Sequence, residues 1–199
     1  MRALLLALLL GILVGGPFEN NQDIGITSKP GTAEYNTATR VYQVTGGGAN
    51  IWAKQDAFQF VYQKVSGDVT LSADVHFLGE GVEPHRKLAL MIRQSLAPDS
   101  AYADVAVHGD GSTSLQYRPS AGVDTSEFRA AMKSPTHLSI TRHGHEFSIS
   151  ASDVGVAPAA TGPVIVTMRD PVYVGLAVCS HNADVLETAA FSNIRLVAK

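Results

Sequence analysis

Between Asp68 and Arg118, apolar and polar residues alternate through four short runs, and each run is bounded by residues that favour turns. Successive side chains of a β-strand point to opposite faces of its sheet. This period of two therefore predicts antiparallel strands that each bury one face. The pattern predicts an all-β protein. The runs cover residues 69–77, 87–93, 101–108 and 114–118.

The rest of the chain continues as short strands separated by glycine, aspartate, asparagine and proline. About a dozen short strands without a convincing long helix predict one domain that is a β-sandwich or barrel. The uninterrupted apolar run Val172–Cys179 indicates a strand that is covered on both faces, as in two packed sheets. The expected strands are residues 32–36, 40–45, 56–65, 68–78, 87–95, 101–108, 113–118, 136–142, 146–151, 163–168, 171–180 and 188–197.

Three short segments have the composition of tight hairpin turns, since Asp-Gly favours the positive φ values of a type I′ turn. Two longer connections, residues 79–86 and 152–162, are candidates to frame a site, because functional residues often lie on such loops. Residues 124–133 fit either one helical turn, from the capping-box spacing of Asp124 and Glu127, or an edge strand. The expected hairpin turns are Ser66-Gly67-Asp68, Asp110-Gly111 and His143-Gly144.

The first sixteen residues have the pattern of a secretory signal peptide. Arg2 precedes an apolar run, Ala3–Val14, which two glycines follow. The run is shorter than the ~20 apolar residues that a spanning helix needs. We therefore expect a signal peptide at 1–16, a domain at 17–199 without a transmembrane anchor, and a secreted or periplasmic protein. An uncleaved N-terminal anchor is the alternative.

Charge and cysteine content exclude some classes of protein. The formal net charge is -3, which argues against a nucleic-acid partner because such proteins carry basic surfaces. Cys179 is the only cysteine, so no intrachain disulfide can form. It lies inside an apolar run, which favours a buried structural thiol over a nucleophile or metal ligand.

Several short motifs occur along residues 17–199: Phe18-Glu19-Asn20-Asn21-Gln22-Asp23-Ile24-Gly25, Gly46-Gly47-Gly48 with Asn50 and Trp52, Ala101-Tyr102-Ala103-Asp104, Val107-His108-Gly109-Asp110-Gly111, Val172-Tyr173-Val174-Gly175-Leu176, Cys179-Ser180-His181-Asn182 and Phe191-Ser192-Asn193-Ile194. Together they resemble an exported bacterial β-sandwich family of unassigned function in the concanavalin A-like lectin and glucanase superfamily. The resemblance covers nearly all of residues 17–199 and implies an antiparallel jelly-roll sandwich with about a dozen strands in two sheets. Domains of this family often precede a Tol-type propeller, and the sequence up to Lys199 contains none, so we expect a stand-alone or truncated version.

The polar residues of the predicted meander share one face of its sheet. This face is the candidate ligand-binding face, and we expect its side chains to project toward solvent or a groove. Guanidinium, amide and carboxylate groups can form paired hydrogen bonds with sugar hydroxyls, and aromatic rings supply an apolar platform. The alternative is an ordinary solvated sheet face with a cross-strand ion pair between Arg93 and Asp104. The candidate ligand-binding residues are Trp52, Arg93, Tyr102, Asp104, His108, Gln116, Arg118 and His181.

Two clusters invite further interpretations. His85-Arg86-Lys87 is either a positive cluster for an anionic sugar or acidic partner, or a solvated loop end. The segment His143-Gly144-His145-Glu146 contains zinc-ligand types, but it lies at a predicted hairpin tip, which favours a turn. No cofactor is expected beyond a structural calcium ion between the chain ends, which the resemblance suggests. The candidate calcium ligands are Glu19, Asp23 and Asp170.

Sequence motifs for catalysis are missing. The chain has no Gly-x-Ser-x-Gly, no His-Glu-x-x-His and no Glu-x-Asp-x-Glu on one strand, so we assign no catalytic residue. The first hypothesis is an exported, non-catalytic module that binds carbohydrate. The alternatives are an envelope protein-interaction domain and a glycoside hydrolase with a non-standard carboxylate pair. That pair would combine Asp104 with Asp56 or Asp74.

Overall fold

A computed structural model describes residues 16–199. The predicted signal peptide lies outside the described residues except for Gly16. Within the described part the chain forms fifteen β-strands and no helix, so no helix there could cross a membrane. The predicted all-β class is confirmed.

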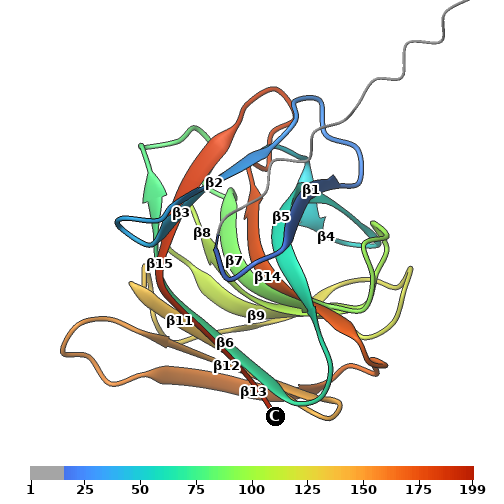
Figure 1. Cartoon of the computed structure of the whole chain (residues 1–199). Coiled ribbons are helices and arrows are strands. Elements are labelled where there is room, and N and C mark those ends of the chain that lie inside the picture. Colours follow the sequence, from blue (N-terminus) through green and yellow to red (C-terminus); the bar gives the residue numbers. More distant parts are fainter. Residues whose placement is uncertain (1–15) are drawn as a thin grey trace, which may run out of the picture.

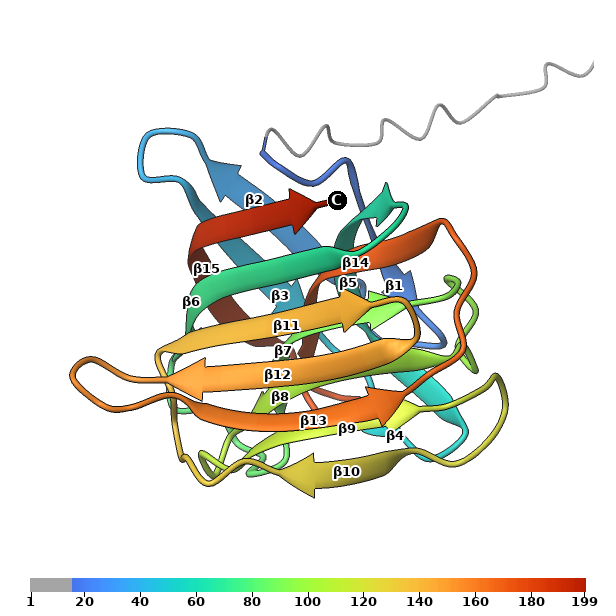
Figure 2. The same ribbon diagram turned by 90° about the horizontal axis from the view of Figure 1, so that it is seen from below.

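The strands form two antiparallel sheets that pack face to face (Figures 1 and 2). The eight-stranded sheet has the order β1 (Asn20–Ile24), β5 (Gln55–Val65), β14 (Val172–Cys179), β7 (Lys87–Arg93), β8 (Tyr102–His108), β9 (Thr113–Arg118) and β10 (Ser126–Arg129), and β4 (Asn50–Trp52) pairs with β5. The seven-stranded sheet has the order β13 (Ala159–Ile165), β12 (Glu146–Ser152), β11 (His137–His143), β6 (Val69–Leu78), β15 (Glu187–Ala198), β3 (Val41–Gly46) and β2 (Thr32–Asn36).

One apolar core lies between the two sheets. It is built from the parity that the alternating pattern predicts, for example Leu88, Leu90 and Ile92 on β7 against Leu71 and Ala73 on β6, all buried. Burial of aliphatic side chains in such a layer is the main favourable contribution to folding. The predicted jelly-roll sandwich is confirmed.

The eight-stranded sheet also carries a second apolar layer on its outer face, which the sequence did not predict. Ile51, Phe58, Phe60, Met91 and Tyr102 form this layer, and each is buried. The connections between β4 and β5, between β7 and β8 and between β9 and β10 cover it: Leu96 packs against this layer, and the Thr125 hydroxyl contacts the Tyr102 hydroxyl and the Ala53 carbonyl. Strands β7 and β8 are consequently buried on both faces.

The predicted meander is correct for β7, β8 and β9, which are consecutive neighbours. It is wrong for β6, which belongs to the other sheet, so Ser66-Gly67-Asp68 joins the two sheets and is not a hairpin turn. The other two predicted hairpins are confirmed, since β8 pairs with β9 and β11 with β12. Residues 126–129 form the edge strand β10, and Val172–Cys179 is the predicted central strand.

Candidate functional site

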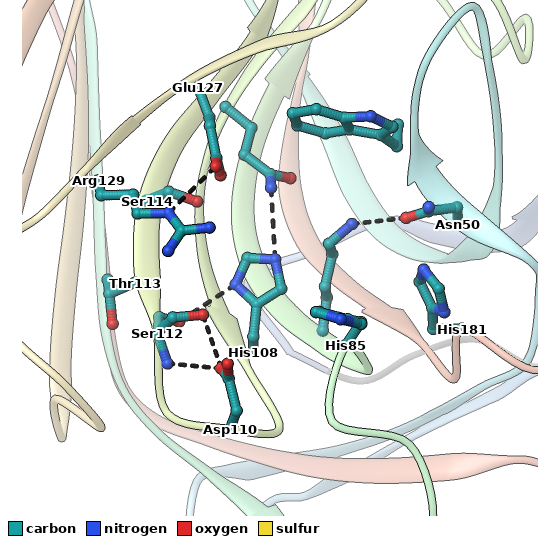
Figure 3. Close-up of a pocket in the computed structure, with 13 residues that line it drawn as sticks. Asn50, His85, His108, Asp110, Ser112, Thr113, Ser114, Glu127, Arg129 and His181 are labelled. Carbon is teal, nitrogen blue, oxygen red and sulfur yellow. Dashed lines mark hydrogen bonds and ion pairs between the residues drawn. The ribbon is translucent and has the colours of Figure 1, made fainter.

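A pocket of about 270 Å³ lies on the outer face of the eight-stranded sheet. Strands β7, β8 and β9 form its floor, and the edge strand β10 and the short strand β4 form walls on either side. The loops before β7 and after β14 close one end (Figure 3). This volume lies just below the ~300–1,000 Å³ of typical small-molecule sites, so it suits a small ligand or one unit of a longer chain.

Polar side chains and small residues make up the floor. Strand register places Lys87 opposite His108, and it places Ser114 opposite Ala106 and Gln116 opposite Asp104. The alternate residues of these strands face the other sheet, so the floor residues face outward. The short side chains at the centre leave a hollow in the sheet face.

His108 fixes the orientation of Gln116. The Nδ1 of His108 lies 3.1 Å from the carbonyl oxygen of Ser112, so Nδ1 carries the proton and donates it. The Nε2 is then an acceptor, and it lies 3.4 Å from the Gln116 Nε2 that donates to it. Burial, together with the charge of Lys87, lowers the pKa of His108 to about 4 and keeps the ring neutral.

The floor presents buried oxygen atoms that lack a hydrogen-bond partner within residues 16–199. They are Oγ of Ser114 and Oε1 of Gln116, both on residues that line the pocket and are 1% exposed. Leaving such a group unpaired costs about 1–3 kcal/mol, so it calls for a polar partner. Both carboxyl oxygens of Asp104 are also unpartnered, and burial raises the pKa of Asp104 well above its usual value.

The two walls differ in chemistry. Asn50 and Trp52 come from β4, and the Trp52 ring supplies an apolar surface. Glu127 and Arg129 come from β10, and Arg129 Nε donates to Glu127 Oε1 at 3.2 Å. Asp110, in the β8–β9 turn, accepts hydrogen bonds from the backbone N–H and the hydroxyl of Ser112, at 2.8 and 2.6 Å.

Lys87 is a buried cation at the end of the floor. Its ammonium donates to Asn50 Oδ1 at 2.6 Å and to the carbonyl of Ile51 at 3.1 Å. It also lies 5.8 Å from the centre of the Trp52 ring. Burial lowers the pKa of Lys87, since desolvation disfavours the charged form.

Three histidine rings gather at the same end (Figure 3). The ring centre of His85 lies 6.4 Å from that of His108 and 5.5 Å from that of His181. Partial burial and the charge of Lys87 lower the pKa of His181. The lowered pKa values of His108 and His181 favour their neutral forms, so these two rings add no positive charge to that of Lys87.

Four of the eight predicted ligand-binding residues line the pocket: Trp52, His108, Gln116 and His181. Their role in binding stays a prediction. Arg93, Tyr102, Asp104 and Arg118 do not line it and are fully buried, so the expectation that they project to solvent or a groove is wrong. The expected ion pair between Arg93 and Asp104 does not form either, because Arg93 lies 3.5 Å from Asp56 instead.

Arg118 and Asp56 form a buried pair beneath the loops. Two nitrogens of Arg118 donate to the two carboxylate oxygens of Asp56 at 2.8 and 2.6 Å. The same guanidinium donates to the carbonyls of Ala53 and Ser100 at 3.0 and 2.9 Å. The pair thus links the β4–β5 connection to the β7–β8 connection, and it holds the strand that carries Trp52.

Several pocket residues were not predicted from the sequence. Asn50 and Glu127 lie on β4 and β10, two strands too short to give a clear alternation. Lys87 was assigned to a positive cluster with His85 and Arg86. That cluster is not one surface, since Arg86 is buried against Glu187 while His85 is exposed. Lys87 could have been identified from the alternation of β7, which places it on the polar face of that strand.

The predicted calcium ligands are not brought together. Glu19 precedes β1 and Asp23 lies near its far end, where it accepts from the backbone of Gly31. Asp170 instead binds Arg142 at 2.6 Å. No group of three metal-ligand side chains occurs in the part of the chain that the structure describes. The three residues do not fit a shared calcium ion.

No family model and no curated protein matches the chain. Solved structures share its fold. A functionally unknown protein from Saccharomyces cerevisiae has a TM-score of 0.64 at 16% identity, over 89% of this chain and 97% of that one. Lectin II from Ulex europaeus has a TM-score of 0.57 at 11% identity, over 89% and 96%. The carbohydrate-binding module CBM66 from Bacillus subtilis has a TM-score of 0.50 at 18% identity, over 92% and 100%.

Proposed function

We propose that the protein is a non-catalytic carbohydrate-binding module and that the pocket on the eight-stranded sheet is its site. The observation that carries the proposal is the pair of buried, unpartnered oxygens on the floor, from Ser114 and Gln116. A sugar hydroxyl both donates and accepts hydrogen bonds, so one sugar ring can satisfy an amide oxygen and a serine hydroxyl together.

The walls support the same class of ligand. A sugar ring has an apolar face of C–H groups, and Trp52 offers an aromatic surface against which such a face can pack. Glu127 and Arg129 on the opposite wall offer acceptors and donors for the ring's outer hydroxyls. Sites of this kind combine an apolar surface with a few fixed polar groups.

The fold adds support. Two of the similar structures are named as a lectin and a carbohydrate-binding module. Since one fold hosts many functions, the proposal rests on the pocket and takes only background support from these names. We further propose that the protein acts as a secreted or periplasmic module, supported by the apolar run at its N-terminus.

The carboxylate pair suggested for a glycoside hydrolase does not lie in the pocket. Asp104 is fully buried and does not line the pocket, Asp56 is bound to Arg118, and Asp74 lies on β6 of the other sheet. Two carboxylates flanking one bond are what most such enzymes need. No observation therefore favours hydrolysis in this pocket.

The test is isothermal titration of the predicted mature protein, residues 17–199, against a panel of glycans, followed by the Gln116→Met variant. This change removes the unpartnered oxygen at similar side-chain volume. We expect binding to weaken about tenfold, which corresponds to about 1.4 kcal/mol for one buried hydrogen bond. The melting temperature should change little, because removal of the unsatisfied oxygen offsets the loss of the long hydrogen bond from Gln116 to His108.

Gln59→Met is the matched control. Gln59 also has a buried, unpartnered amide oxygen, but it does not line the pocket. Its substitution should leave glycan affinity unchanged. If the folded wild-type protein binds no glycan of the panel, the proposal is wrong, and a pull-down from envelope extract would then test the protein-interaction alternative.

A further inference from the structure

Lys87 stands out in the pocket because its positive charge has no negative partner. The residue is 3% exposed, and its two hydrogen-bond acceptors, Asn50 Oδ1 and the carbonyl of Ile51, are both uncharged. None of the ion pairs within residues 16–199 includes Lys87. Buried cations in proteins are normally paired with an anion.

The ammonium group has one donor left for a ligand. A protonated lysine carries three N–H donors, and two of those of Lys87 are engaged by Asn50 and Ile51. Lys87 lines the pocket, so a ligand bound in the pocket can accept a hydrogen bond from the third N–H.

The carboxylates of the pocket do not neutralise this charge. Glu127 is paired with Arg129, and Asp110 is bound by the backbone and hydroxyl of Ser112. Asp104 is fully buried beside Gln116, but neither of its carboxyl oxygens has a hydrogen-bond partner within residues 16–199 and it forms no ion pair with Lys87 there. The positive charge at this end is consequently open to an anion from outside.

We propose that the ligand is an acidic saccharide whose carboxylate or sulfate group binds the ammonium of Lys87. This inference rests on the proposed function and specifies the ligand class of the same site. The anionic group lies at the Lys87 end, between the β4 wall and the histidines. The sugar ring then extends over Ser114 and Gln116 with Trp52 beside it.

The test compares the binding of charged and neutral forms of the same saccharide to residues 17–199, by isothermal titration at low ionic strength. The probes are short oligomers of galacturonate, mannuronate, guluronate and hyaluronan, each with its carboxyl-reduced counterpart. Sulfated and desulfated carrageenan oligomers form a second arm, which separates a carboxylate from a sulfate ligand. We expect at least one acidic oligomer to bind at least tenfold more tightly than its neutral counterpart.

Substitution then locates the charge contact. Lys87→Met should abolish the preference for the acidic form, while Lys64→Met, at an exposed lysine outside the pocket, should leave it intact. Melting curves establish that each variant is folded. The wild-type comparison of charged and neutral oligomers decides the question even if Lys87→Met does not fold.

Three results would overturn the inference in different ways. If neutral saccharides bind as well as their acidic forms, the acidic ligand is wrong while the carbohydrate-binding function stands. If Lys87→Met retains the preference for the acidic form, Lys87 is not the residue that binds the anionic group and the inference is wrong in that respect. If no saccharide binds, charged or neutral, both proposals are wrong.

Discussion

Arg118 holds the wall of the pocket in place without lining the pocket itself. Its guanidinium is fully buried, and it donates to the carbonyls of Trp52 and Ala53 as well as to both oxygens of Asp56. Paired, charge-assisted hydrogen bonds of this geometry are among the strongest in proteins. The residue therefore acts on binding through the position of Trp52.

Arg118→Met should destabilise the fold by about 3–5 kcal/mol, because it leaves the carboxylate of Asp56 buried without its main partner. Urea denaturation measures the change in the free energy of unfolding. Arg129→Met is the matched control, since the Arg129 pair with Glu127 is exposed and such pairs contribute about 0–1 kcal/mol.

A double-mutant cycle separates the ion pair from simple packing. In Arg118→Met combined with Asp56→Asn the uncompensated charge is gone, so the loss should be smaller than the sum of the two single losses. Equal stability of the wild type and Arg118→Met would show that the buried pair does not hold the loops.

The fate of the predicted site residues has one physical cause. Strand parity correctly placed Arg93, His108, Gln116 and Arg118 on one face of the sheet, but parity does not say what covers that face. Irregular connections cover the end that carries Arg93 and Arg118 and leave the His108 end open. Such connections have no periodicity, so their course was not predictable.

Among the elements, the connection from β3 to β4 explains the run Gly46-Gly47-Gly48. A Cβ at Gly46 would clash with the carbonyl of Val178 on β14, and one at Gly48 would clash with the carbonyl of Ala57 on β5. Gly48 also has a φ of 104°, which side chains rarely adopt. The glycines let the chain pass close to the sheet and bring β4 to the pocket.

Gly48→Ala should therefore destabilise the protein more than Gly144→Ala. Gly144 also has positive φ, 58°, but an added Cβ there meets nothing within 4 Å. Gly144→Ala should cost about 1–2 kcal/mol from backbone strain alone. Gly48→Ala adds a clash with backbone, typically a further ~1–3 kcal/mol.

Urea denaturation of both variants gives the difference directly. Glycan affinity should also fall in Gly48→Ala, because a shifted β4 displaces Trp52, and should stay unchanged in Gly144→Ala. Equal losses of stability in the two variants would mean that the close approach at Gly48 does not constrain the fold.

The bounds of the longer strands were predictable from the alternation, but the sheet that each strand joins was not. Strands β2 and β9 match the predicted ranges, and β5 and β6 differ from them by one residue at the start. The turn Ser66-Gly67-Asp68 was assigned to a hairpin because a strand that buries one face alternates in the same way whichever sheet it joins. Two strands were missed because they are short, β1 and β4, while β10 is one of the two alternatives left open for residues 124–133.

At the scale of the whole molecule, ionisable groups of both sheets determine how stability depends on pH, and they act in different ranges. The pKa values of Asp68 and Asp74 are lowered, mainly by hydrogen bonds from Gly144 and from Asn193. Their contribution is present above the ordinary aspartate value of 3.8 and is lost only as pH falls through their lower folded values. Between pH 4 and 6.5, the dependence of stability on pH comes mainly from buried groups around the pocket.

His108 should make stability rise with pH in that range. Its folded pKa is about 4 and its ordinary value is 6.5, so between these values the unfolded chain binds more protons than the folded one. Stability is thus full above pH 6.5 and falls as the solution becomes more acidic. The difference in pKa corresponds to about 3 kcal/mol, at about 1.4 kcal/mol per unit.

The contribution is isolated by comparing the wild type with His108→Asn in urea denaturation at pH 4.5 and pH 7. Asp104 acts in the opposite sense, because its pKa is raised, and His181 acts in the same sense. Both remain in the variant, so the wild type should lose more stability than the variant on acidification, and that excess belongs to His108. Identical losses in the two proteins would mean that His108 takes up a proton in the folded state near pH 6. The ring would then be charged beside Lys87, and the hydrogen bond that orients Gln116 could not form.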